Sequence, residues 1–210
     1  MTTSLRILAL VCSGAALLLS SCSSTYDVNQ SSMLVSVEDQ TMLLTQFGKP
    51  VKSYKVSTSK FGLGDTPRSM RTPLGRMQVA KKIGHKQPEG AVFKARRPTG
   101  EVIPPNAPGR DPIVTRILWL KGTERRNKNA FKRYIYIHGT PEESRIGHAA
   151  SYGCIRMNSR DVVDLYSRIG VNAEVKVIRG PLNATFKGRE YVRMEKAARK
   201  QSSVDSGDKA

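Results

Sequence analysis

Short runs in which apolar and polar residues alternate occupy much of the chain, a pattern typical of β-strands with one buried face. Turn-forming residues separate the runs, for example Glu38-Asp39-Gln40 after the first. On this basis we expect strands at 33–37, 41–45, 50–56, 76–83, 113–120, 131–138 and 173–178. The pattern predicts a mainly β domain.

Two segments depart from this alternation. Residues 57–75 are rich in Gly, Ser, Thr and Pro, which predicts a long surface loop of the kind that carries function. Further along, Asn158 is a suitable helix N-cap, and Gly170 is a suitable stop. Between them the apolar residues recur at helical spacing: Val162, Leu165, Tyr166 and Ile169. We therefore expect one prominent helix after residue 158.

The N-terminal end has a different composition. In residues 1–21 a single charge, Arg6, precedes an apolar run that is short for a membrane span, which is typical of a secretory signal. Its end, Leu19-Ser20-Ser21-Cys22, resembles the lipobox of bacterial lipoproteins, in which the cysteine becomes the lipidated first residue. The alternative is an ordinary cleavable signal, or a short anchor, in which Cys22 is incidental. We expect an exported lipoprotein, anchored at the inner or outer membrane and facing the periplasm and cell wall.

The expected domain limits follow from these composition changes. Residues 22–32 are polar and have little to bury, so they read as a tether. Residues 33–180 would form the folded domain, and residues 181–210 a basic C-terminal extension. In that extension we expect a short helix at 189–200 and a disordered tail at 201–210.

The chain is strongly basic, with 35 Lys and Arg against 17 Asp and Glu and a formal net charge of +18. Such a surface favours polyanionic partners. However, the cations are dispersed, aromatic residues make up only 6% of the chain, and export is expected. Anionic polymers of the cell envelope therefore suit the charge better than nucleic acid does.

Cys154 is the one cysteine of the expected folded domain, since Cys12 lies in the signal and Cys22 would carry lipid. A lone thiol in an oxidising compartment is expected to be buried or used. His138, at the end of an expected strand, could generate the thiolate and later protonate a leaving amine. Gly153 would let backbone N–H groups turn toward the reacting carbonyl. These residues indicate acyl transfer through a thioester.

Two other kinds of chemistry fit the same stretch less well. A zinc site of His138, His148 and Cys154 would lack an evident fourth ligand, so we expect no metal. Glu142 and Glu143 lie between the two halves of the stretch, where a solvated loop is expected rather than acid catalysis.

The full stretch is more specific than the Cys/His pair, and it resembles the signature of the L,D-transpeptidase (YkuD) family. The residues that carry the resemblance are His138-Gly139-Thr140, Ile146-Gly147 and Ser151-x-Gly153-Cys154-Ile155-Arg156-Met157, followed by a helix. The resemblance extends over residues 33–180. It implies a curved sheet or barrel-like β-sandwich with the helix packed against it, and no metal or organic cofactor.

The resemblance also implies roles for individual residues. Cys154 would be the nucleophile and His138 its base, with backbone oxyanion donors at Tyr152, Gly153 and Cys154. Gly139 and Ser151 would belong to the same motif. Arg156 could hold a substrate carboxylate or brace the loop, and we favour bracing. Many family members have histidine where Tyr152 stands, which leaves the local tuning of the site open.

Three further residues are candidates for substrate contact. His148 lies in the loop before the cysteine, and His85 follows an expected strand end. Tyr136 shares a strand face with His138, so it could line a groove or pack in the core.

The substrate class that the resemblance implies is the peptidoglycan stem peptide. Cys154 would attack the carbonyl of the diamino acid at position three of a tetrapeptide and release the terminal D-alanine. An amine of a second stem would then give a 3-3 crosslink, an amine of an envelope protein would give an anchored protein, and water would give L,D-carboxypeptidase activity. A non-catalytic peptidoglycan-binding module is the alternative from another class. The sequence does not decide among the acceptors.

Overall fold

The computed structural model describes residues 30–207, so the signal segment 1–21, Cys22 and most of the expected tether lie outside the described residues. Within it, the strands and helices are, in chain order, β1 (Ser31–Ser36), β2 (Thr41–Gln46), β3 (Lys49–Lys55), β4 (Gly75–Ile83), β5 (Ala91–Lys94), β6 (Arg97–Val102), β7 (Ile113–Gly122), β8 (Tyr136–Gly139), β9 (Ile155–Met157), α1 (Ser159–Arg168), β10 (Glu174–Ile178) and α2 (Phe186–Gly207). β1 takes in Ser31 and Ser32, which were expected to belong to the tether.

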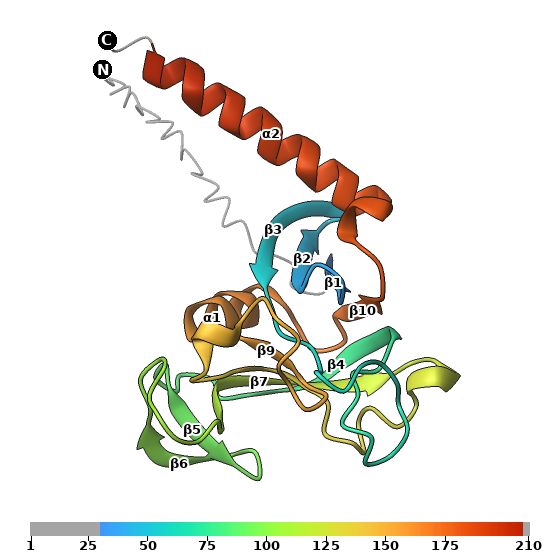
Figure 1. The fold of residues 1–210 in the computed structure, drawn as a ribbon, viewed down its shortest axis with the longest axis vertical. Helices are drawn as coiled ribbons and strands as arrows, with labels where there is room; N and C mark the ends of the chain where they lie inside the picture. The colour runs from blue at the N-terminus through green and yellow to red at the C-terminus, as the bar shows by residue number, and fades with distance from the viewer. Residues whose placement is uncertain (1–29, 208–210) are drawn as a thin grey trace, which may run out of the picture.

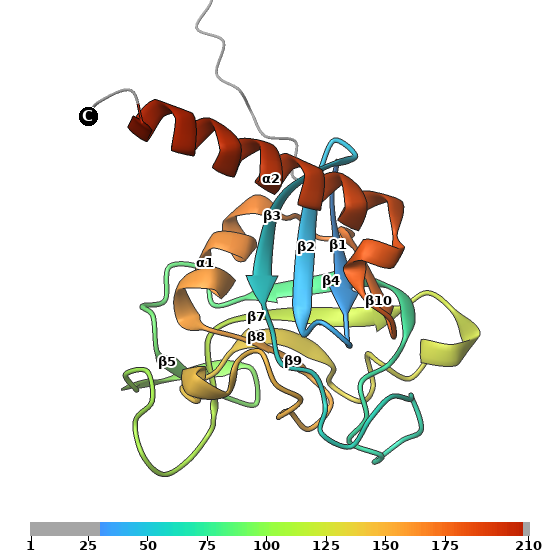
Figure 2. The same cartoon turned by 45° about the horizontal axis from the view of Figure 1, so that its top comes forward.

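The strands form one open, mixed and strongly curved sheet. Its strand order is β3-β2-β1-β10-β4-β7-β5-β6. In addition, β8 pairs with β7 on one side and with β9 on the other. Most neighbours are antiparallel, whereas β1 with β10 and β8 with β9 are parallel. In Figures 1 and 2 strands β1–β3 run across strands β4 and β7, so the sheet curves around the buried core. The prediction of a mainly β, curved-sheet domain is confirmed.

The main core fills the space inside this curve and is closed by α1. Leu44, Leu118, Ile137 and Leu165 from four different elements are all fully buried in it. Truncating one such side chain to alanine typically costs about 2–5 kcal/mol. α1 begins as predicted at Asn158, whose side chain accepts a hydrogen bond from the Asp161 N–H (2.8 Å).

The segment before β8 departs from the expected strand at 131–138. Tyr134 has φ +57°, and the Ile135 N–H bonds back to the Ala130 carbonyl (3.1 Å), so residues 130–135 form a turn. β8 begins only at Tyr136. The short strands β5, β6 and β9 were also not predicted.

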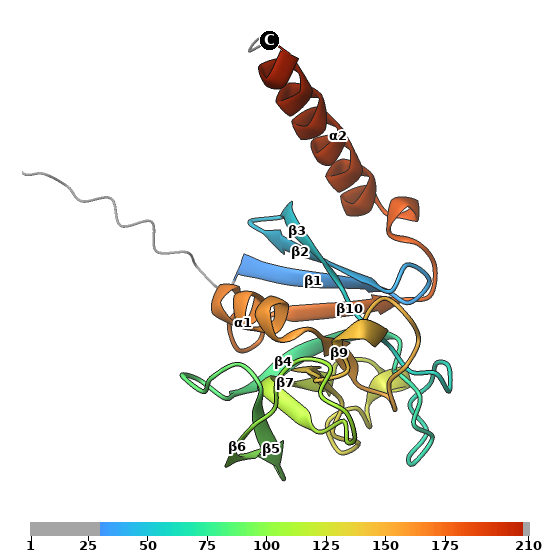
Figure 3. The same cartoon turned by 60° about the vertical axis from the view of Figure 1, so that its left-hand side comes forward.

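The C-terminal helix is longer than expected. α2 begins before residue 189 because Thr185 acts as an N-cap, its Oγ1 accepting from the Gly188 N–H (3.0 Å). It continues to Gly207, so the expected disorder is wrong for residues 201–207, and the last three residues lie outside the described range. Figure 3 shows α2 projecting from the sheet. Of the helices in residues 30–207, none combines the length and apolar character that crossing a membrane requires.

Candidate active site

The parallel pairing of β8 with β9 places His138 and Cys154 on the same face of the sheet. His138 pairs with Arg156, and paired residues of neighbouring strands share a face of the sheet. Cys154 lies immediately before β9 and packs against the cluster that contains Tyr136, whose side chain shares a face of β8 with His138. Two side chains that lie sixteen positions apart in the sequence thus belong to neighbouring segments of the sheet.

His138 is buried, at 5% exposure, and its ring is fixed by one hydrogen bond. Its Nδ1 lies 2.8 Å from the carbonyl oxygen of Gly139. A carbonyl only accepts, so Nδ1 carries the proton and Nε2 keeps its lone pair. Burial, assisted by the charge of Arg156, lowers the pKa of His138 to about 4. The histidine is therefore a neutral base at pH 7.

Gly139 allows β8 to approach β7 closely at this point. A β-carbon on Gly139 would lie 2.7 Å from the Val114 carbonyl oxygen and 3.1 Å from the Thr115 side chain. Any side chain here would push β8, and His138 with it, away from β7. Gly139 thus positions the histidine both by its small size and by its carbonyl.

The Cys154 thiol is half-buried beside the turn that precedes β8. Its Sγ lies 3.4 Å from the Tyr134 carbonyl oxygen, to which it donates. Burial raises the pKa of the Cys154 thiol to about 11, although a backbone hydrogen bond with Tyr136 and the charges of Arg156 and Arg133 oppose that shift. The resting pair is therefore a neutral thiol and a neutral imidazole.

The turn that carries Cys154 is held from inside by Ser151. Ser151 Oγ donates to the Cys154 carbonyl (2.5 Å) and accepts from the Gly153 N–H (3.2 Å). Gly153 has φ +119°, a backbone conformation that residues with a side chain rarely adopt, and a β-carbon at this position would lie 3.3 Å from the Arg71 carbonyl oxygen. Ser151 and Gly153 therefore set the backbone that presents the thiol.

The same turn is held from outside by the long loop 57–72. Thr72 Oγ1 donates to the Gly153 carbonyl (3.1 Å) and accepts from the Ser59 N–H (3.0 Å). The backbones of Ser57 and Arg156 exchange two hydrogen bonds of 2.9 Å. The loop that the composition singled out thus packs against the nucleophile's turn.

Arg156 braces the site from behind His138. It is bound by Asp111 (2.5 Å) and Glu142 (3.1 Å), and its side chain is only 6% exposed. Thr140, next to the histidine motif, donates through Oγ1 to the other oxygen of Asp111 (2.5 Å). Of the two roles considered for Arg156, this geometry fits bracing, with carboxylates as the partners.

Both glutamates of the loop are structural, so the expectation that they are merely solvated is wrong. Glu142 is half-buried against Arg156, and Glu143 accepts from the Ser159 N–H (2.7 Å) at the start of α1. Asp111, which the sequence reasoning missed, lies in a Pro- and Gly-rich loop with no local signal. Its role depends on contacts between distant parts of the chain.

In front of Cys154 lies a cavity of about 320 Å³. It is lined by Pro67, Arg68, Met70, Lys132, Arg133, Ile135, Tyr152 and Cys154. Tyr152 is 55% exposed there, and its hydroxyl accepts from Lys60 Nζ (3.1 Å). Arg133 forms a buried ion pair with Asp65 (2.9 Å) and donates to the Gly64 and Arg71 carbonyls, which ties the loop 57–72 to the turn before β8.

The three candidate contact residues have different outcomes. Tyr136 is 4% exposed and packs edge-on against Trp119, so of the two roles considered for it the structure fits core packing and not substrate contact. His85 and His148 are exposed, and neither is among the residues that line the cavity of Cys154. Within residues 30–207, no three side chains of His, Cys, Asp or Glu gather as metal ligands.

Comparison with known proteins gives a family match and several L,D-transpeptidase relatives. The family model of the L,D-transpeptidase catalytic domain, YkuD, matches residues 30–177. The chain is 29% identical over 133 residues to the probable L,D-transpeptidase YbiS of Escherichia coli K12, covering 61% of this chain and 39% of that protein. It is 46% identical over 46 residues to the putative L,D-transpeptidase YkuD of Bacillus licheniformis, covering 22% and 28%.

Among solved structures, a match is L,D-transpeptidase 3 from Mycobacterium tuberculosis, with TM-score 0.47 and 16% identity over 71% of this chain and 61% of that chain. The chain thus spans about a quarter to two fifths of the length of the two curated relatives named above. The family model, in contrast, covers more than half of this chain. The chain belongs to the L,D-transpeptidase catalytic domain (YkuD) family.

Proposed function

We propose that this protein is a peptidoglycan L,D-transpeptidase in which Cys154 is the nucleophile and His138 the general base. The observation that carries the proposal is the fixed tautomer of His138. With Nδ1 bound to the Gly139 carbonyl, Nε2 is the ring nitrogen left to accept a proton on the face that His138 shares with Cys154. Family membership and the printed activities of the relatives support the same reaction class.

In the first half-reaction the Cys154 sulfur attacks the carbonyl carbon of the diamino acid at position three of a tetrapeptide stem. A C–S bond forms as the thiol proton passes to His138 Nε2. The tetrahedral intermediate then collapses, the C–N bond to D-alanine breaks, and His138 returns the proton to the leaving amine. The products are a thioester on Cys154 and free D-alanine.

In the second half-reaction an acceptor amine attacks the thioester and gives a proton to His138. A new C–N bond forms, the C–S bond breaks, and the proton returns to the Cys154 sulfur. An amine from another stem yields a 3-3 crosslink, and an amine from an envelope protein yields an anchored protein. Water in place of the amine yields a trimmed stem.

Backbone N–H groups would stabilise the oxyanion in both steps. The Gly153 N–H is engaged by Ser151 Oγ, whereas no described residue accepts from the N–H of Cys154 or of Tyr152. We therefore assign the oxyanion donors to Cys154 and Tyr152, with Gly153 and Ser151 shaping the turn. Removing one such donor typically lowers kcat by about 10²–10³-fold.

We also propose that the protein is an exported lipoprotein with lipid on Cys22, and that residues 33–180 are its catalytic unit. The sequence of the N-terminal segment supports the anchor. Labelling with a radioactive fatty acid, in a strain that carries Cys22→Ser beside the wild type, tests it. Label in wild type but not in the variant is expected, and equal labelling would contradict the proposal.

Muropeptide analysis after incubation with defined tetrapeptide donors tests the enzymatic proposal. We expect crosslinked or trimmed products with wild-type protein, and none with Cys154→Ala. Crosslinks, protein-linked stems and trimmed stems differ in mass, so the same experiment identifies the acceptor. Unchanged donors with the wild type, or turnover by Cys154→Ala, would contradict the mechanism. The first outcome would favour a binding module.

A further inference from the structure

The cavity in front of Cys154 has an excess of positive charge. Three cationic side chains line it, Arg68, Lys132 and Arg133, and no carboxylate is among its lining residues. Arg133 is already neutralised by its buried ion pair with Asp65. The surplus therefore belongs to Arg68 and Lys132. Neither has an ion-pair partner or a side-chain hydrogen bond among residues 30–207.

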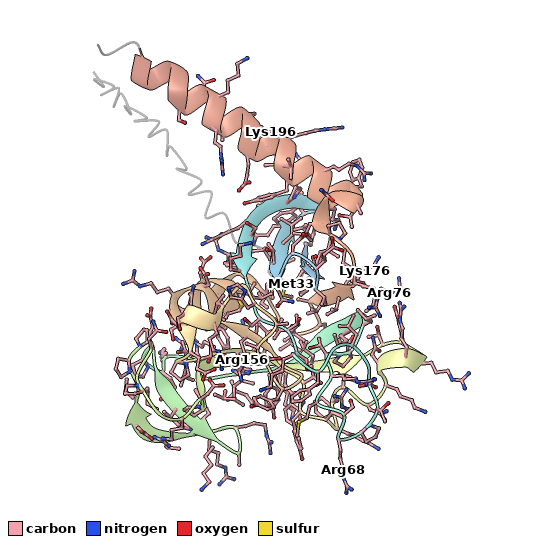
Figure 4. The ribbon with its side chains drawn as sticks, viewed as in Figure 1. Met33, Arg68, Arg76, Arg156, Lys176 and Lys196 are labelled. Atoms are coloured by element: carbon pink, nitrogen blue, oxygen red, sulfur yellow. The ribbon has the colours of Figure 1, made fainter. Side chains whose placement is uncertain are left out.

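Both cations extend from backbone that is held in place. Lys132 precedes Arg133, which is anchored to Gly64, Asp65 and Arg71. Arg68 lies in the turn closed by the Ser69 N–H to the Thr66 carbonyl (3.2 Å), and the carbonyl of Met70 is bound by Ser59 Oγ (2.5 Å). The side chains themselves are exposed. In Figure 4 Arg68 extends outward from the outer end of its loop.

The Arg68 turn also adopts an uncommon backbone conformation. Arg68 has φ +63° and Met70 has φ +55°, and neither is the glycine that this region of conformational space favours. Strain of this kind persists when the surrounding contacts impose it, and it is concentrated at functional sites. Here the imposed turn keeps Arg68 at the mouth of the cavity.

The remaining walls of the cavity suit a short aliphatic peptide. Pro67, Met70 and Ile135 supply apolar surface, and Tyr152 supplies an exposed ring. A ligand that fits must therefore combine an aliphatic part with negative charge close to the carbonyl that Cys154 attacks. Carboxylate is the matching group, because both guanidinium and ammonium groups bind it by charge-assisted hydrogen bonds.

We propose that Arg68 and Lys132 form a carboxylate-recognition pair that selects acyl donors with free carboxylates flanking the scissile amide. This inference rests on the proposed function, which supplies two such groups. One is the terminal carboxylate of the leaving residue, and the other is a side-chain carboxylate on the position-three diamino acid. Donors with an amide in place of the recognised carboxylate, or with a diamino acid that lacks it, are disfavoured.

The test measures the rate of Cys154 thioester formation by intact-protein mass spectrometry with three matched tetrapeptides. One has both carboxylates free, one is amidated at the C-terminus, and one is amidated on the position-three side chain. With wild-type protein, we expect amidation of the recognised carboxylate to slow acylation by on the order of tenfold. The donor that is slowed identifies which carboxylate is bound.

Arg68→Gln and Lys132→Gln keep the side chains polar and remove the charges. We expect the double variant to lose the preference for the free carboxylate, so that the ratio of its acylation rates with the free and the amidated donor falls to about one. Arg179→Gln, an exposed cation that is not among the residues lining this cavity, is the matched control and should keep the preference. A higher salt concentration should weaken the preference in the wild type.

Four outcomes separate the inference from the function on which it rests. Equal rates with all three donors in the wild type would overturn the inference and leave the transpeptidase proposal standing. An undiminished preference in the double variant would do the same. Absence of any thioester with every donor would instead overturn the proposed function. Slower acylation of all donors by the double variant, in equal proportion, would also contradict carboxylate recognition.

Discussion

The cations around Cys154 occupy two contrasting regions. Behind His138, Arg156 is buried between two carboxylates, with side-chain exposure of 6%. In front of the cysteine, Arg68 and Lys132 are exposed at a cavity, and neither forms an ion pair with a carboxylate of the part of the chain that the structure describes. Figure 4 shows the difference directly, with Arg156 inside the body of the protein and Arg68 at its outer edge.

The difference shows that cationic side chains around Cys154 have two separate roles. A buried cation with fixed partners holds backbone and neighbouring groups in place, and it cannot be released without a large cost. An exposed cation without a partner contributes little to folding and remains available to a ligand. The region behind His138 therefore sets geometry, and the region in front of Cys154 sets selectivity.

The sharpest contrast should come from removing one arginine from each region. Arg156→Gln leaves the half-buried Asp111 without its cation and leaves Glu142 only the exposed Arg145, and we expect the free energy of unfolding to fall by about 3–5 kcal/mol. Arg68→Gln should change it by no more than about 0.5 kcal/mol. Urea denaturation of both variants provides the measurement. Similar small effects at the two positions would remove the distinction between the regions.

The second effect concerns His138, which burial keeps neutral. Its pKa is about 4 in the folded protein, whereas an unburied histidine has a pKa of 6.5. Between these two pH values His138 is therefore protonated in the unfolded chain and neutral in the folded protein. The free energy of unfolding should therefore fall as pH drops from 6.5 to 4, by up to about 3 kcal/mol from this group. At pH above 6.5 the contribution of this titration is constant.

His138→Asn is the matched control, because asparagine has a similar shape and does not titrate. Carboxylates titrate in both proteins, so the quantity to compare is the difference between the two curves of stability against pH. We expect that difference to change across pH 6.5 to 4 and to be flat above it. Parallel curves throughout would contradict a neutral, buried His138.

A third effect separates crowding from backbone strain at the nucleophile's turn. Gly153 and Gly147 both have positive φ, +119° and +98°, but only Gly153 has a carbonyl oxygen 3.3 Å from the place of a β-carbon. We expect Gly153→Ala to cost about 2–3 kcal/mol and Gly147→Ala about 1 kcal/mol. Thermal denaturation measures both. A larger cost at Gly147 would refute the role assigned to the packing of loop 57–72.

The smallest effect contrasts the two helices. Asn158 caps α1, which packs in the core, whereas Thr185 caps α2, which is largely exposed. Each cap is worth about 1 kcal/mol to its helix. Asn158→Ala should lower global stability by that amount, and Thr185→Ala should speed amide exchange in α2 alone. Hydrogen exchange distinguishes them, and a global effect of Thr185→Ala would show that α2 supports the domain.

Local patterns were sufficient where local chemistry decides the structure. The alternation of residues predicted the strands that became β1 to β4, and Asn158 with its helical spacing predicted α1. The motif around His138 and Cys154 predicted the pair that β8 and β9 bring to one face. In these cases the residues that determine the element are close together in the sequence.

Other features of the fold and the site depend on contacts between residues that are far apart in the sequence. Asp111 reaches Arg156 only because β7 and β8 pair, and nothing in its own Pro-rich loop signals that role. Thr72 supports Gly153 across 81 positions. Tyr134 belongs to an alternating apolar run, yet its φ of +57° ends the strand pattern there, and alternation carries no information about that angle.

The central claim is that Cys154, with His138 as its base, is acylated by a tetrapeptide stem. Intact-protein mass spectrometry of the purified protein after brief exposure to the tetrapeptide tests it most directly. The account predicts an adduct with the mass of the donor minus D-alanine, mapped by proteolysis to Cys154 and absent from Cys154→Ala. An unmodified thiol under conditions in which the stem is consumed, or an adduct on another residue, would contradict it.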